Sequence, residues 1–207
     1  MLDFELAEHI AFRTVFPNII LQGCYFHFKQ CLYKRFVNLP GYTEVPDLKK
    51  YVNSIYGLAF VPVQDVLRTW DDLKNLLLLL FPTIIDPIIT YFEATWLFGN
   101  YPLALWNVYH CTMLGDPRTN NNSEGGNNGI NLSFATTSPT MPKFCDKLQL
   151  YNCEHEFKLQ QLFRNRNPNR APRTSEVQRQ EDIRAIVAGY NVANRLQYCR
   201  TLGYLYS

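Results

Sequence analysis

Apolar residues at the start of the chain recur with helical spacing. Between Leu2 and Phe16 they fall every three or four positions, which places them on one face of an α-helix. The residues of this stripe are Phe4, Ala7, Ile10, Ala11, Val15 and Phe16. Asp3 can cap the start of the helix, and Pro17-Asn18 breaks the pattern. The pattern therefore predicts an amphipathic helix over residues 2–16.

A short apolar run then predicts a strand. Ile19-Ile20-Leu21 suits a buried strand over Ile19–Cys24, and a helix over residues 28–38 follows it. The inward residues of that helix are Phe28, Cys31, Leu32 and Phe36. One strand cannot form a sheet alone, and the rest of the chain offers almost no other convincing strand. We therefore expect its neighbours to come from another chain or from sequence upstream of Met1.

The middle of the chain is predicted to be helical and rich in core residues. Pro40-Gly41 marks a boundary, and prolines and glycines separate the apolar patterns that follow. The predicted helices are Asp47–Phe60, Val63–Leu80, Ile84–Phe98 and Leu103–Cys111. Trp70, Trp96 and Trp106 are core candidates. Prolines and acids around Leu76–Leu80 favour a buried helix over a membrane span.

The last third alternates polar loops with helices. Residues 115–137 have the composition of a loop, although Asn122 or Ser123 with Glu124 could cap a short helix running towards Phe134. A helix is predicted over residues 142–163. Its core candidates are Phe144, Leu148, Tyr151 and Phe157. A proline-containing stretch, Arg164–Arg173, precedes a final helix over residues 176–201.

Composition narrows the class of protein. The chain has 207 residues, of which 47% are hydrophobic and 18% charged, so a folded core is expected rather than disorder. A net charge of +2 does not by itself indicate nucleic acid. The six cysteines form no CxxC pair, which favours reduced thiols in an intracellular protein. The first residues have no signal-peptide pattern, and no membrane partner is predicted.

Four blocks of residues resemble one protein family. They are Asp3-Phe4-Glu5, Val15-Phe16-Pro17, Gly23-Cys24-Tyr25-Phe26-His27-Phe28 and Asn120-Asn121-Asn122-Ser123-Glu124-Gly125. In order and spacing they are similar to the transposase domain of Mutator-like DNA transposons, the MULE family. The similarity covers residues 1 to about 160, and the first 28 residues are its most specific part.

The resemblance implies a fold, a metal site and a division of the chain. Family members have an RNase H-like core with an Asp-Asp-Glu triad and a helical insertion before the Glu. Asp3 is then the second acid and Glu124 the third, and together they would hold Mg²⁺ or Mn²⁺, while the first Asp and first strands lie upstream of Met1. The expected fold is mainly α with a small α/β remnant. The expected segments are a partial RNase H-like core (1–39), the helical insertion (40–115), the end of the catalytic core (116–163) and a basic linker with a C-terminal helix (164–207).

Cys24 and His27 correspond to the family's Cys-x-x-His motif, whose role the sequence leaves open. A tetrahedral zinc site needs about two more ligands. His110-Cys111 or Cys153 with His155 could supply them, but no spacing demands it. The residues alone favour a packing role, with Cys24 buried and His27 hydrogen-bonded, so zinc is not the expected cofactor.

The basic stretch is the predicted DNA contact. Arg164, Arg166, Arg170 and Arg173 could bind phosphates, and a solvated linker is the simpler interpretation of the same residues.

Asp3 and Glu124 likewise have simpler interpretations, as a helix cap and a surface or capping residue.

Three functions remain in competition. The first is a transposase-derived nuclear protein whose ancestral activity is metal-dependent DNA cleavage and strand transfer, inactive alone because the first Asp is missing. The second is a non-catalytic remnant that binds DNA or a protein, including a second copy or a full-length transposase. The third is a fragment of a decayed mobile element whose unpaired strand promotes aggregation.

Overall fold

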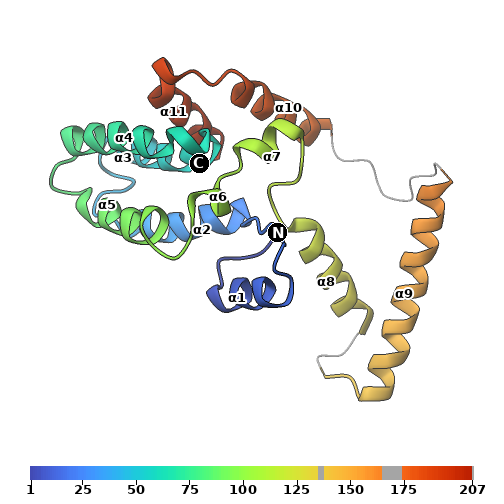
Figure 1. Ribbon diagram of the computed structural model, residues 1–207. Coiled ribbons are helices and arrows are strands. Elements are labelled where there is room, and N and C mark those ends of the chain that lie inside the picture. The colour runs from blue at the N-terminus through green and yellow to red at the C-terminus, as the bar shows by residue number, and fades with distance from the viewer. Residues whose placement is uncertain (135–137, 165–173, 207) are drawn as a thin grey trace. The chain divides into compact units, whose positions relative to one another are not determined.

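The computed structural model describes residues 1–134, 138–164 and 174–206. Within helix α8 it describes the backbone alone at residues 122–124, 127, 131, 133 and 134. The chain forms two units, Met1–Thr119 with Arg179–Ser207, and Asn120–Gln178, and each is described by itself. Figure 1 shows that both are built from helices.

The first unit contains most of the helices. In chain order they are α1 (Leu6–Val15), α2 (Tyr25–Phe36), α3 (Leu48–Val52), the 3-10 helices η1 (Asn53–Phe60) and η2 (Val63–Asp65), α4 (Val66–Leu80), α5 (Asp86–Phe92), the π-helix η3 (Glu93–Leu97), α6 (Leu103–Trp106), α7 (Tyr109–Leu114), the end of α10 (Thr174–Ala188), the 3-10 helix η4 (Val192–Asn194) and α11 (Arg195–Leu205). These bounds confirm a helical middle segment, although each of the four helices predicted there is divided into shorter elements.

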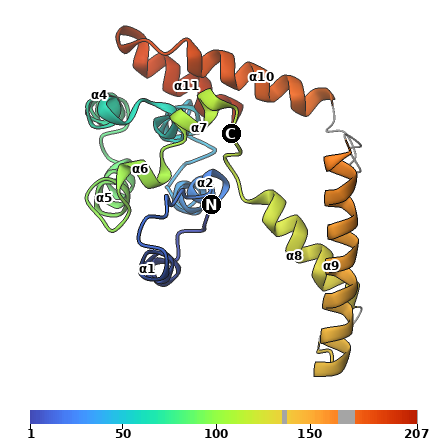
Figure 2. The same cartoon turned by 45° about the vertical axis from the view of Figure 1, so that its right-hand side comes forward.

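The centre of this unit is the contact between η1 and α11. All eight residues of η1 are buried. Gly57 of η1 and Gly203 of α11 let the two backbones meet, because a Cβ at Gly57 would lie 2.5 Å from the carbonyl oxygen of Cys199 and a Cβ at Gly203 2.4 Å from that of Asn53. Figures 1 and 2 show α11 beside α3 and α4, which it also contacts. The C-terminal helix therefore belongs to the core of this unit.

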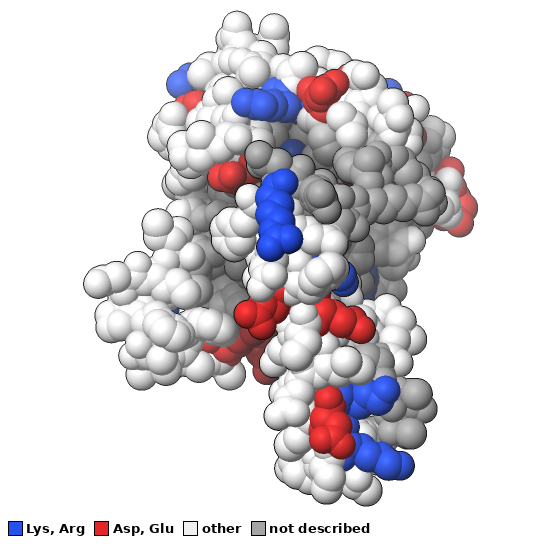
Figure 3. Space-filling view, turned by 90° about the vertical axis from the view of Figure 1, so that its right-hand side faces the viewer, with Lys and Arg blue, Asp and Glu red and all other residues white. Residues whose placement is uncertain are grey.

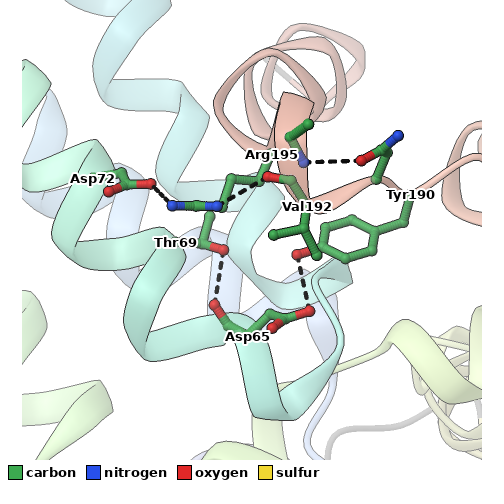
Figure 4. Close-up of polar contacts among 8 residues, drawn as sticks. Asp65, Thr69, Asp72, Tyr190, Val192 and Arg195 are labelled. Atoms are coloured by element: carbon green, nitrogen blue, oxygen red, sulfur yellow. Dashed lines mark hydrogen bonds and ion pairs between the residues drawn. The ribbon is translucent and has the colours of Figure 1, made fainter.

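Polar contacts fasten the same end of the chain to α4. Tyr190 donates its hydroxyl to Asp65 Oδ2 at 3.2 Å, and Thr69 donates to the Asp65 carbonyl at 2.8 Å. Arg195 forms an ion pair with Asp72, and these residues are drawn in Figure 4. The predicted single helix over residues 176–201 is wrong, because α10 ends at Ala188 and the chain turns before α11 begins.

Aromatic side chains fill the core of the first unit. The three tryptophans are almost completely buried, which confirms them as core residues. The rings of Phe28 and Trp106 stack with centroids 5.0 Å apart. Trp106 donates its indole N–H to the Trp96 carbonyl at 2.9 Å, and Trp70 donates to Glu93 Oε1 at 2.9 Å. The indole N–H groups of Trp70 and Trp106 thus have acceptors inside the core.

The first helix does not bury the apolar stripe that defines it in the sequence. Its only buried residue is His9, whereas Ile10 and Val15 are 57% and 67% exposed. Phe4 lies before the helix and packs its ring edge-on against Trp96 and Tyr101. Phe4 and the buried His9, whose ring also meets Tyr101 edge-on, anchor this segment, and most of the apolar stripe faces outward.

The predicted strand over Ile19–Cys24 is also wrong. Ile19 and Ile20 are exposed, and within the described ranges the pairing is limited to one parallel bridge between Leu2 and Gly23. A strand needs a partner along its length, and these described parts of the chain supply one for a single residue pair. The RNase H-like remnant therefore stays a prediction, while the mainly helical class is confirmed.

The second unit contains α8 (Asn121–Phe134), α9 (Met141–Phe163) and the start of α10. The α8 backbone confirms a helix that reaches Phe134, and α9 confirms the helix predicted after Pro142. Tyr151 donates its hydroxyl to the Gly126 carbonyl at 3.2 Å, which links α9 to α8. Phe144 and Phe157 are exposed rather than buried, so as core candidates they are wrong.

No helix among the described residues is both long enough and apolar enough to cross a membrane. Leu77 of α4 is buried whereas Leu79 is 77% exposed, as expected for a surface helix with one apolar face.

Candidate functional site

Three side chains with metal-binding chemistry meet beside the start of α2. They belong to Asp3, Cys24 and His27, and one ligand atom from each lies within 4.8 Å of the other two. Asp3 precedes α1, whereas Cys24 and His27 lie at the start of α2. Residues from two of the sequence blocks therefore share one site.

Backbone hydrogen bonds bring the two segments together. The Leu2 N–H donates to the Gln22 carbonyl and the Cys24 N–H donates to the Leu2 carbonyl, both at 2.9 Å. These bonds form the parallel bridge between Leu2 and Gly23. Asp3 and Cys24, one residue further along each segment, are thus held next to each other, and Figures 1 and 2 both show the N-terminus beside the start of α2.

Gly23 permits this close approach. A Cβ at this position would lie 2.5 Å from the Phe4 ring and 3.0 Å from the Leu105 carbonyl. The Gly23 N–H donates to that carbonyl at 2.7 Å, and the Gln22 side-chain amide donates to it at 2.8 Å. The segment before α2 is therefore fixed against α6 on one side and Phe4 on the other.

The first turn of α2 places Cys24 and His27 on the same side. Cys24 is the residue before the helix, has extended backbone angles and is fully buried. His27 follows three positions later, the spacing that puts two residues on one helical face. Its Nδ1 lies 2.8 Å from Asp3 Oδ1.

The backbone around Asp3 is held from two further directions. The buried His9 donates its Nε2 hydrogen to the Asp3 carbonyl at 2.5 Å. Tyr101 donates its hydroxyl to the Phe4 carbonyl at 2.6 Å. The position of the Asp3 carboxylate thus depends on α1, on the loop before α6 and on α2.

The three side chains differ in their access to solvent. The Asp3 and His27 side chains are 46% and 22% exposed, and Cys24 is buried. Solvent can therefore reach the site beside Asp3 but not beside Cys24. One carboxylate, one imidazole and one thiol form a mixed donor set that suits zinc-like ions better than Mg²⁺, which prefers oxygen ligands alone.

Among the described side chains, none of the other predicted site residues belongs to the group of Asp3, Cys24 and His27. Glu124 lies on the α8 backbone in the second unit, and its side chain is outside the described atoms. Arg164 ends α9 and is exposed, while Arg166, Arg170 and Arg173 lie outside the described residues. Among the side chains that are described, the group has three members, and His110 and Cys111 on α7 are not among them.

A second feature, a lysine- and tyrosine-lined groove, was missed by sequence reasoning. Two hollows of about 350 and 430 Å³ share Tyr42, Lys49 and Asn53 as lining residues. Lys29 and Tyr56 line the first hollow, and the Lys29 ammonium lies 5.6 Å from the centre of the Tyr56 ring. We call these two hollows the lysine groove.

The lysine groove concentrates positive charge. The pKa of Lys29 is lowered by burial, then by repulsion from Arg179 and Lys49. In the face drawn in Figure 3, by contrast, acidic side chains lie among the Lys and Arg side chains that can be seen. The groove has no local signal in the sequence because its residues come from α2, α3, η1, α11 and the segment between α2 and α3.

No family model, no curated protein and no solved structure matches the chain.

Proposed function

We propose that this chain is a transposase-derived protein of the MULE type, whose Asp3 corresponds to an acid of the metal site. The observation that carries the proposal is the contact between Asp3 and His27. Of the four blocks that carry the resemblance, one contains Asp3 and another contains Cys24 and His27. Motif blocks of one active site are expected to meet in space, and these two do.

The Asp3 carboxylate is suited to a catalytic metal in its access and its support. It is nearly half exposed, so a hydrated divalent ion can reach it. His27 orients Oδ1, and the hydrogen bond from His9 holds the backbone at the same residue. In two-metal phosphoryl chemistry, carboxylates bind the ions that activate the nucleophile and stabilise the leaving oxygen. Asp3 would supply one such carboxylate.

The proposed activity of this chain alone is metal and DNA binding rather than cleavage. The resemblance assigns the second and third acids of the triad to Asp3 and Glu124, and two-metal cleavage needs carboxylates around both ions. Cleavage and strand transfer are therefore expected only where the first Asp of the triad joins them, and the proposed compartment is the nucleus.

Mn²⁺ binding tests this assignment directly. Paramagnetic Mn²⁺ would be titrated into the full chain and into Asp3→Asn, with Asp116→Asn as a control that removes an exposed acid elsewhere. We expect Asp3→Asn to weaken Mn²⁺ binding and Asp116→Asn to leave it unchanged. Equal binding by all three proteins would remove Asp3 from the metal site, and plasmid nicking abolished by Asp3→Asn would show that the chain is active alone.

The lysine groove supports the second candidate, a non-catalytic protein that binds nucleic acid. Lysine ammonium groups attract phosphates, and tyrosine rings offer surfaces on which bases stack. Burial lowers the pKa of Lys29, and repulsion from Arg179 and Lys49, which a bound anion would relieve, lowers it further. This candidate does not need the metal site, because phosphate contacts give affinity without chemistry.

A salt titration with a matched charge control tests the lysine groove. The binding of a fluorescent single-stranded DNA would be measured for the full chain and for Lys29→Gln/Lys49→Gln. Lys143→Gln/Lys147→Gln on α9 removes the same charge elsewhere. Each lost phosphate contact lowers the slope of log K against log salt by about 0.7 for single strands. An equal loss in both double variants would mean that the groove has no special role.

A further inference from the structure

We infer that Asp3, Cys24 and His27 form a binding site for one zinc-class transition-metal ion, with Cys24 Sγ, His27 Nδ1 and an Asp3 carboxylate oxygen as ligands. This site shares the Asp3 carboxylate with the Mg²⁺ or Mn²⁺ pair proposed above and differs from it in the Cys24 and His27 donors, and its existence does not depend on any DNA chemistry. The observation that carries it is the grouping of the three ligand atoms within 4.8 Å.

The distances are close to those of a tetrahedral site. Zinc bonds of about 2.0–2.3 Å separate ligand atoms by roughly 3.3–3.8 Å when the ion is four-coordinate. The longest separation in the group does not exceed 4.8 Å, and Asp3 Oδ1 to His27 Nδ1 is 2.8 Å. Binding would require side-chain rotations that shorten the longest of these separations to about 3.8 Å and lengthen the distance from Asp3 Oδ1 to His27 Nδ1 to about 3.3 Å. The Leu2–Gly23 bridge would hold both backbones in place during these rotations.

The donor atoms select the class of ion. A thiolate and an imidazole are ligands that zinc, cobalt and related ions accept, whereas Mg²⁺ and Ca²⁺ prefer oxygen. Three protein ligands leave a fourth position for water or another group. The exposed side of Asp3 is the direction from which the ion and that fourth ligand would come, because Cys24 is buried beneath it.

The surroundings supply the rigidity that such a site needs. Gly23 is fixed by its hydrogen bond to the Leu105 carbonyl, and a larger residue there would strike the Phe4 ring. His9 holds the Asp3 carbonyl from the opposite side. Groups that orient metal ligands in this way raise affinity without touching the ion.

Cobalt spectroscopy of the full chain tests the inference. Co²⁺ takes the same ligands as zinc and reports a bound thiolate through a charge-transfer absorption. Exposed Cys145 and Cys153 would first be replaced by serine to remove other thiol sites, and this protein is the reference. We expect it to bind one equivalent of Co²⁺ with a thiolate band and the strong visible bands of tetrahedral cobalt, and zinc to displace the cobalt.

Single variants in the reference protein assign the ligands. Cys24→Ser should abolish the thiolate band, and Asp3→Asn or His27→Gln should each weaken cobalt binding at least about tenfold, as the loss of even an orienting group often does. The matched control is Cys31→Ser, which removes another thiol of α2 outside the group and should change nothing.

Three results would overturn the inference. They are the absence of a thiolate band in the reference protein, an unchanged band in Cys24→Ser, and equal cobalt affinity in Asp3→Asn and His27→Gln. Circular dichroism would show whether Cys24→Ser still folds. If it does not, Asp3→Asn and His27→Gln decide the question, because both side chains are partly exposed and their replacement leaves the core intact.

Discussion

Asp3 Oδ1 lies 2.8 Å from His27 Nδ1, although the two residues belong to segments on either side of α1. The pair joins the residue proposed as a catalytic acid to the residue proposed as a transition-metal ligand. A polar contact whose carboxylate is nearly half exposed contributes little to stability. We therefore expect this contact to matter more for the site than for the fold.

This view gives a first prediction about stability. Asp3→Asn should change the free energy of unfolding by less than about 1 kcal/mol, the usual range for an exposed pair. Asp47→Asn is the matched control, because Asp47 forms an exposed pair with Lys50 at 3.6 Å. Urea denaturation measures both. A much larger loss for Asp3→Asn than for Asp47→Asn would mean that the pair is structural.

The close approach of η1 and α11 gives a second prediction. Gly57→Ala and Gly203→Ala should each destabilise the chain by about 1–3 kcal/mol or more, because the new methyl group meets backbone atoms that cannot move aside. Gly125→Ala on α8 is the control, since a Cβ there meets nothing within 4 Å and should stabilise the helix by up to about 1 kcal/mol. Urea denaturation would measure the free energy of unfolding of all three variants and show whether its change has the expected sign in each.

Glu93 gives a third prediction, for the dependence of stability on pH. Hydrogen bonds from Lys74 and Trp70 lower the pKa of Glu93 below its usual 4.5. A lowered folded-state pKa stabilises the protein above the unfolded value, and this contribution is lost as pH falls through the folded pKa. Glu93→Gln should therefore destabilise the chain near neutral pH, with the difference from the unsubstituted chain shrinking below about pH 4.

Urea titrations of both proteins across this range measure the effect. Trp70→Phe, which removes one donor to Glu93, should show part of the same pH dependence. A destabilisation by Glu93→Gln that is as large at low pH as at neutral pH would contradict the assignment, since it would not come from the charge of Glu93.

The thiols give a fourth prediction. Cys145 and Cys153 are exposed, whereas Cys199 is buried and burial raises the pKa of its thiol. Because the thiolate is the reactive form, iodoacetamide should modify Cys145 and Cys153 first and Cys199 only on unfolding. Mass spectrometry of timed samples gives the order. Early modification of Cys199 in the folded chain would show that α11 is not packed against η1 as described.

The outward-facing apolar residues give a fifth prediction. Phe16 and Ile20 are 54% and 93% exposed, close to the exposed Ile10 and Val15. Neighbouring apolar side chains of this kind favour association, so we expect the chain to form a complex with a second copy. Phe16→Ser/Ile20→Ser should reduce the mass measured by sedimentation. Leu79→Ser/Leu80→Ser, on α4, should not.

The sequence by itself determined the helices whose signals are local. The helical pattern after Pro40 and the helix from Met141 to Phe163 follow from residue spacing, because helical hydrogen bonds join residues a few positions apart. For the helix reaching Phe134 the local signals disagreed, since the composition favoured a loop and the capping residues favoured a helix. The tryptophans were predicted as core residues because burying a large aromatic ring removes much apolar surface from water. The mainly helical class follows from the same local evidence.

The tertiary structure decided which faces are covered and which side chains meet. The apolar stripe of α1 faces outward and Ile19–Cys24 forms no strand, because burial and strand pairing both depend on a partner that periodicity does not reveal. The resemblance placed Asp3 in one metal site with Glu124, and the residues alone favoured a packing role for Cys24 and His27. Only the bridge between Leu2 and Gly23 showed that Asp3 lies against His27, since contacts between distant segments depend on how the whole chain packs.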